Sequence, residues 1–124
     1  MKLAVSSVGP KLDSPVDPRF GRCAYFLFID SHDLSFEAVD NTNSSLGGGA
    51  GIQAAKLVVT HGAKVVLTGN CGPNAHQTLS AAGVEVIVGC GGTVAEVVQQ
   101  YNDGKLRPSS SPNVVSHAGQ RSGG

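Results

Sequence analysis

The sequence lacks several features that would point to common classes of function. It has no excess of either charge, since nine Lys and Arg residues balance nine Asp and Glu residues, whereas nucleic-acid-binding proteins usually carry a basic excess or stripe. It has no apolar run of about 18 residues, so we expect no membrane-spanning helix. Its first residues do not form the long apolar segment and cleavage site of a secretory signal peptide. These absences predict a cytoplasmic protein that binds neither nucleic acid nor membrane.

Cysteine is scarce, and its spacing suggests no pairing. The three cysteines, Cys23, Cys71 and Cys90, lie far apart in the sequence and form no C-x-x-C motif. An odd number without dense pairing is not typical of a secreted disulfide framework. We therefore expect reduced thiols in a reducing compartment.

The pattern of apolar residues predicts one α/β domain over residues 1–107. The expected strands cover residues 3–7, 24–30, 35–40, 64–68 and 84–88. The expected helices run from Ala50 to His61, from Pro73 to a stop at Gly83, and from a Thr93–Glu96 capping box to a stop at Gly104. Residues 108–124 are rich in Ser, Pro and Gly without periodicity, so we expect a disordered tail.

This order of elements restricts the sheet topology. The first half reads as an antiparallel meander, and the second half contains a βαβ unit, which requires parallel strands and a right-handed crossover. A mixed five-stranded sheet in the order 3-2-1-4-5, with strand 2 antiparallel to the rest, satisfies both halves. The predicted fold class is therefore α/β, with three α/β/α layers in the ribonuclease H-like arrangement.

Charged and glycine-rich loops are expected at one edge of this sheet, beyond the carboxyl ends of the parallel strands, where ligands of such sheets bind. Arg19 and Arg22 follow the first strand. Three glycine-rich segments precede the three helices and contain Gly49 and Gly51, then Gly72, Pro73 and Asn74, then Gly91 and Gly92. Helix N-termini favour anions, and glycine lets the backbone approach a ligand. The sequence thus predicts a crevice for an anionic ligand, unless these glycines serve only in turns and caps.

Four further residues are candidate metal ligands. Cys23, Cys71 and Cys90 all map to this same edge, and adjacent strands lie about 4.8 Å apart, so Cys71 and Cys90 could approach each other. Thiolates are soft ligands that suit copper(I), zinc and iron–sulfur clusters. His76, in the first turn of the second expected helix, could join them. The alternative is that each cysteine is a small buried apolar residue.

Several motifs occur in a characteristic order along the chain. They are Asp17-Pro18-Arg19-Phe20-Gly21-Arg22, Gly49-Ala50-Gly51, Gly72-Pro73-Asn74-Ala75, Gly92-Thr93-Val94-x-Glu96 and Tyr101-x-x-Gly104-x-Leu106. Together they resemble the dinitrogenase iron–molybdenum cofactor biosynthesis proteins over residues 1 to about 107. The resemblance implies a ribonuclease H-like fold and a non-catalytic carrier of an anionic metal–sulfur cluster. That cluster would be an iron–molybdenum cofactor precursor or, as in the orange proteins, a molybdenum–copper sulfide cluster held without covalent attachment.

The resemblance also assigns residues and partners. It implies that Arg19, Phe20, Gly21 and Arg22, together with the Gly72–Asn74 segment, border the cluster, and that cluster-assembly or acceptor proteins are partners. Two alternatives stay open. One is a regulatory or interaction domain without a cofactor. The other is a phosphate- or nucleotide-processing enzyme, for which only Asp13 and Asp17 would supply carboxylates near the crevice.

Overall fold

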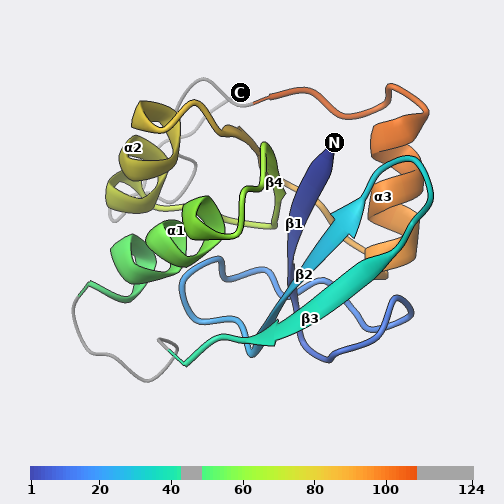
Figure 1. The fold of residues 1–124 in the computed structure, drawn as a ribbon, viewed down its shortest axis with the longest axis horizontal. Coiled ribbons are helices and arrows are strands. Elements are labelled where there is room, and N and C mark those ends of the chain that lie inside the picture. The colour runs from blue at the N-terminus through green and yellow to red at the C-terminus, as the bar shows by residue number, and fades with distance from the viewer. Residues whose placement is uncertain (43–48, 109–124) are drawn as a thin grey trace.

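The computed structural model describes residues 1–42 and 49–108, which form a five-stranded sheet with helices on both faces (Figure 1). The elements are β1 (Lys2–Ser7), β2 (Tyr25–Asp30), β3 (Phe36–Asp40), α1 (Ala50–Thr60), β4 (Val65–Leu67), α2 (Pro73–Ala81), β5 (Glu85–Ile87) and α3 (Val94–Asn102). The predicted order and type of every element are confirmed. The predicted disordered tail covers residues 108–124, and all of it except Pro108 lies outside the described residues.

The sheet has the order β3-β2-β1-β4-β5, as predicted. β2 runs antiparallel to both of its neighbours, β1 and β3, while β4 lies parallel to both β1 and β5. A tight turn joins β2 to β3, in which Asp30 accepts hydrogen bonds from the backbone N–H groups of His32 and Asp33. The likeness of this arrangement to the ribonuclease H fold stays a prediction.

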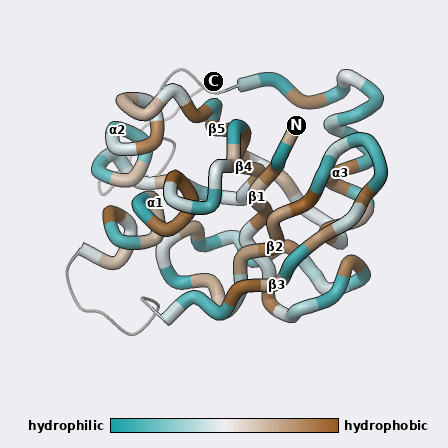
Figure 2. The backbone as a smooth tube through the Cα atoms, in the orientation of Figure 1, coloured by the Kyte–Doolittle hydropathy of each residue, from teal (hydrophilic) through white to brown (hydrophobic). Residues whose placement is uncertain are grey.

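Each face of the sheet is covered by its own helices, which gives the predicted three layers. On one face, α1 and α2 pack on the sheet through residues that include Ala54, Val58 and Leu79. On the other face, α3 packs through Val94, Val97 and Val98. Figure 2 shows hydrophobic stretches along the central strands and more hydrophilic residues on the outer turns of the helices.

The loop between β1 and β2 determines where a site can form. It crosses the edge at which β1 and β4 end, and it makes isolated bridges between Arg19 and Asn70 and between Pro15 and Thr93. It thereby contacts the segments that lead into α2 and α3.

Within the part of the chain that the structure describes, no helix combines the length and apolar character needed to cross a membrane.

Candidate functional site: a cavity at two helix N-termini

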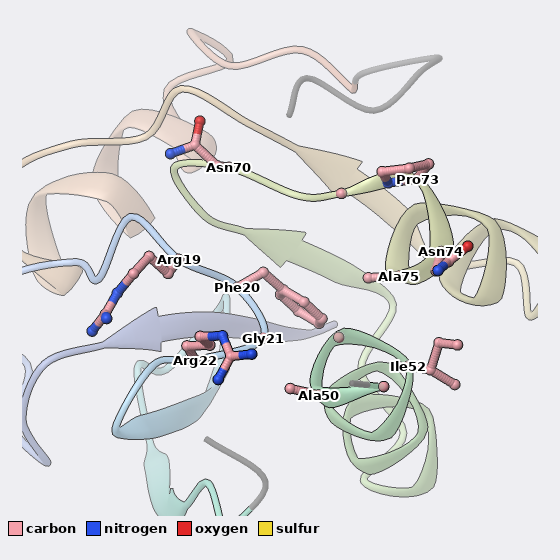
Figure 3. Close-up of a pocket in the computed structure, with 13 residues that line it drawn as sticks. Arg19, Phe20, Gly21, Arg22, Ala50, Ile52, Asn70, Pro73, Asn74 and Ala75 are labelled. Atoms are coloured by element: carbon pink, nitrogen blue, oxygen red, sulfur yellow. The ribbon is translucent and has the colours of Figure 1, made fainter. Parts of the chain in front are cut away.

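A cavity of about 650 Å³ opens at this edge, on the side of the sheet that α1 and α2 cover. Of the predicted ligand-binding residues, Arg19–Arg22, Gly49, Gly51 and Gly72–Asn74 line it (Figure 3). The lining also includes four residues that we did not predict as site residues, namely Ala50, Ile52, Asn70 and Ala75. Ala50, Ile52 and Ala75 lie next to predicted ligand-binding residues in the sequence, and Asn70 lies next to Cys71, which was predicted as a metal ligand. This adjacency is the signal that would have found them.

The loop that carries the two arginines is held at its start by Asp17. The Asp17 carboxylate is buried, and it accepts hydrogen bonds from the Arg19 backbone N–H at 2.9 Å and from Arg19 Nε and Nη2 at 3.2 Å each. This pairing raises the pKa of the Arg19 guanidinium above its ordinary value, first through the hydrogen bond and then through the charge of Asp17. Arg19 is therefore a permanent positive charge at the cavity.

The middle of the loop is anchored between the sheet and the loop after β4. The Phe20 backbone N–H donates to the Asn70 carbonyl at 3.2 Å, and the Asn70 N–H donates to the Pro18 carbonyl at 2.7 Å. The Phe20 ring is 2% exposed and packs against Phe26, with ring centroids 5.2 Å apart. In Figure 3 this ring points from the loop toward α1 and α2. Phe20 thus lines the cavity with apolar surface while fixing the loop to the core.

The end of the loop is held by a buried amide. Asn41, directly after β3, is 1% exposed, and its Nδ2 donates to the Gly21 carbonyl at 3.2 Å and the Cys23 carbonyl at 2.9 Å. Gly21 also contacts the start of α1 closely, because a Cβ built on Gly21 would lie only 2.9 Å from Gly51 Cα and Gly51 N. Only glycine permits this contact, which brings the arginine loop against the helix.

Two helices begin at the cavity without side-chain caps. Gly49 is the N-cap of α1, in the left-handed region with φ of 80°, and Gly72 is the N-cap of α2, followed by Pro73. Neither cap residue makes a side-chain hydrogen bond, and neither first turn contains an acidic residue. The first-turn N–H groups and the positive ends of both helix dipoles therefore contribute to the cavity. Gly51 and Ala75, whose Cβ positions would be 3.4 Å apart, bring the two helix starts together.

The third glycine-rich segment does not line the cavity. Gly91 and Gly92 precede α3, which packs on the opposite face of the sheet. Thr93 and Glu96 form the predicted capping box, in which Glu96 N donates to Thr93 Oγ1 at 3.2 Å and Thr93 N donates to Glu96 Oε1 at 2.8 Å. The expected convergence thus holds for two of the three helix starts.

The three thiols are buried beneath the edge rather than exposed at it, and none lines the cavity. Cys23 and Cys71 belong to the core on the α1 and α2 side, and Cys90 belongs to the core on the α3 side. Burial raises the pKa of Cys23 to about 12, with a contribution from the Asp17 charge, and burial raises the pKa of Cys71 and of Cys90 to about 11. Each thiol is therefore protonated at neutral pH.

The fourth candidate ligand, His76, is 8% exposed in α2, with Nδ1 3.4 Å from Ser80 Oγ, and it does not line the cavity. Within residues 1–42 and 49–108, no three or more His, Cys, Asp or Glu side chains form a group that could hold a metal ion. Metal ligation by His76 and the three cysteines stays a prediction, and in this geometry it would require side chains to move.

The donor set of the cavity fits an anion rather than a bare metal ion. Arg19 and Arg22 are the charged side chains of the described lining, and the rest consists of glycine, backbone N–H groups, two asparagines and apolar surface. Such a lining offers positive charge and hydrogen-bond donors. It offers no thiolate or imidazole to a bare metal ion.

Comparison with known proteins shows which family and which solved structures this chain resembles. A family model described as dinitrogenase iron-molybdenum cofactor matches residues 1–104. The apo form of the orange protein from Desulfovibrio gigas is 43% identical with a TM-score of 0.89, and the match covers 91% of this chain and 96% of that one. A Thermotoga structure solved by NMR as a candidate NifB protein is 36% identical with a TM-score of 0.75, covering 86% of this chain and 91% of that one. An uncharacterized protein of Methanocaldococcus jannaschii is 26% identical over 104 residues, which are 77% of this chain and 88% of that protein.

Proposed function

This chain belongs to the dinitrogenase iron–molybdenum cofactor family, and on that premise we propose that it is a non-catalytic carrier that holds an anionic metal–sulfur cluster as cargo. The cargo is an iron–molybdenum cofactor precursor or a molybdenum–copper sulfide cluster. Cluster-assembly or acceptor proteins supply or receive it. The similarity to the orange protein over most of both chains favours the second kind of cluster.

One observation carries this proposal: two helices without side-chain caps begin at one cavity that two arginines also line. A helix N-terminus carries the equivalent of roughly half a positive charge, so the two helices and the two arginines together favour a polyanion. The buried, protonated thiols support a cargo whose sulfides complete the metal coordination. The protein then contributes charge, backbone N–H groups and an apolar surface rather than metal ligands.

An anaerobic titration tests the proposal. Tetrathiomolybdate is added to the ¹⁵N-labelled protein, with and without copper(I), while amide NMR shifts and visible absorption are followed. We expect a new absorption band that stays with the protein after desalting. We also expect shift changes concentrated at Arg19–Cys23, Gly49–Ile52 and Asn70–Ala75, which surround the cavity.

Removing the two cavity charges tests the electrostatic argument. In the variant Arg19→Gln/Arg22→Gln we expect affinity for tetrathiomolybdate to fall about thirtyfold or more, because each unit charge near an anion contributes on the order of 1 kcal/mol or more. The matched control is Lys64→Gln/Lys105→Gln, which removes the same charge from exposed residues outside the lining. Equal losses in the two variants would reduce the effect to net charge, and no loss in either would refute electrostatic binding in this cavity.

A further inference from the structure

We propose that Asp17, which does not line the cavity, is a positioning residue that fixes Arg19 at the cavity rim for the anionic cargo. This inference rests on the proposed function, because it concerns how that cargo is held. It gives a role to the most deeply buried carboxylate of the described residues, since Asp17 is only 2% exposed.

The contact between Asp17 and Arg19 has the geometry of a positioning device. The carboxylate side chain is 3% exposed and the arginine side chain 64% exposed, so a buried anchor holds a solvent-facing cation. Oδ1 accepts from both the Arg19 backbone N–H and Nε, and Oδ2 accepts from Nη2. The pair therefore uses the edge of the guanidinium that carries Nε and Nη2, and Nη1 lies outside the pair. Figure 3 shows the Arg19 side chain extending away from the start of α1.

Asp17 is itself held by a buried polar network. Its backbone N–H donates to the Ser6 carbonyl at 2.9 Å, and its carbonyl accepts from Ser6 Oγ at 2.7 Å. Ser6 Oγ lies 2.7 Å from Thr68 Oγ1, and both of these residues are fully buried. The main chain at position 17 is thus already fixed to β1 by bonds that any residue could make. The carboxylate is not needed for that task, and each of its bonds goes to Arg19.

Two opposing effects of the carboxylate on cargo affinity can be separated. Holding Arg19 in place removes the loss of side-chain freedom that binding would otherwise impose, which corresponds to about threefold to tenfold in affinity. The negative charge of Asp17 also repels an anion, but that repulsion acts whether or not Arg19 is present. A double-mutant cycle isolates the part that passes through Arg19.

The cycle compares Asp17→Asn in the wild-type and Arg19→Gln backgrounds, with anaerobic tetrathiomolybdate as the probe. Asparagine has the shape of aspartate and can still accept from the Arg19 backbone N–H, so the fold should persist. For each background we take the ratio of tetrathiomolybdate affinity with the Asp17→Asn substitution to affinity with Asp17 intact. We expect this ratio to be about threefold to tenfold lower when Arg19 is present than in the Arg19→Gln background. Equal ratios in both backgrounds, or a more favourable ratio when Arg19 is present, would overturn the role of Asp17.

Arg19→Lys supplies a second test that leaves Asp17 intact. Lysine keeps the charge but lacks the planar fork that pairs with both carboxylate oxygens. We expect Arg19→Lys to lose affinity relative to wild type, and full affinity in this variant would show that the fork is not required.

A readout without cargo completes the experiment. In the wild-type protein the Arg19 Nε–H signal should be observable and slow to exchange with water, and Asp17→Asn should abolish this protection. Unchanged protection in Asp17→Asn refutes the positioning role. Failure of wild-type protein to bind tetrathiomolybdate, with or without copper(I), counts against the proposed function instead, so the two failures are distinguishable.

Discussion

Gly21→Ala tests whether the cavity depends on backbone contact between the arginine loop and α1. A Cβ on Gly21 would lie 2.9 Å from Gly51 Cα and Gly51 N and 3.3 Å from the carbonyl carbon of Ala50. These are backbone atoms of the first turn of α1, so no side-chain rotation relieves the overlap. Either the loop or the start of the helix must shift, and both line the cavity.

The size of the effect follows from two terms. Gly21 is not among the glycines with positive φ, so alanine suits its backbone and would otherwise stabilise the protein by about 0.4–1 kcal/mol through the unfolded state. Overpacking of this kind typically costs about 1–3 kcal/mol. From the midpoints of these two ranges, the free energy of unfolding should fall by about 1.3 kcal/mol, which lowers Tm by roughly 5–10 °C for a domain of this size.

Gly91→Ala is the matched control. A Cβ there meets nothing within 4 Å, its φ is not positive, and it lies outside the cavity lining. Thermal unfolding followed by circular dichroism, with anaerobic tetrathiomolybdate titration, should give lower Tm and lower affinity for Gly21→Ala and neither loss for Gly91→Ala. Wild-type values in Gly21→Ala would refute the contact as the feature that shapes the cavity. Lost affinity in Gly91→Ala would instead show that Gly91 belongs to the binding site, as predicted from the sequence.

Three further predictions concern groups that the structure places outside the cavity lining. The raised pKa values, about 12 for Cys23 and about 11 for Cys71 and Cys90, leave on the order of 0.1% or less thiolate at pH 8. Disulfide-exchange reagents should therefore label these thiols rapidly only when the protein is unfolded in guanidinium. Rapid labelling of the native protein would contradict their burial. Because these values lie above the ordinary 9.0, the neutral thiols favour the fold below about pH 9, and Tm should fall as pH rises from about 9 to 12. Thr93→Ala should lower the free energy of unfolding by about 0.5–2 kcal/mol through loss of the α3 cap, yet leave tetrathiomolybdate affinity unchanged. A selective loss of affinity would place α3 at the site.

The sheet order was predictable because local patterns left little choice. The apolar run over residues 24–30 and the loosely alternating run over residues 35–40 are separated by a short polar turn, which indicates a hairpin. The later strands alternate with helices that require parallel pairing. Both expectations are confirmed in the sheet. The arginine loop and the starts of α1 and α2 were likewise predictable as neighbours, because each follows a strand that ends at the same edge or leads into a helix that begins there.

The surroundings of the cysteines were not predictable in the same way. Sequence places Cys23, Cys71 and Cys90 at the ends of strands on one edge, but it does not fix the direction in which each side chain points. In the structure Cys23 and Cys71 join the core beside Phe20, and Cys90 joins the core beside Val94. Burial on two different faces of the sheet is a property of packing between layers, which spacing along the chain does not encode.

The sequence nevertheless distinguishes the start of α3 from the starts of α1 and α2. α3 begins with a Thr93–Glu96 box, so its first turn carries its own carboxylate and its N–H groups already have acceptors. A Cβ on Gly92 would lie 2.6 Å from Glu96 Oε1, so this glycine makes room for the protein's own acid. α1 and α2 begin with glycine caps and no acidic residue. A helix whose first-turn N–H groups and dipole already face its own carboxylate gains little from another anion. Of the three helix starts that the structure describes, α1 and α2 are therefore the ones suited to an external anion.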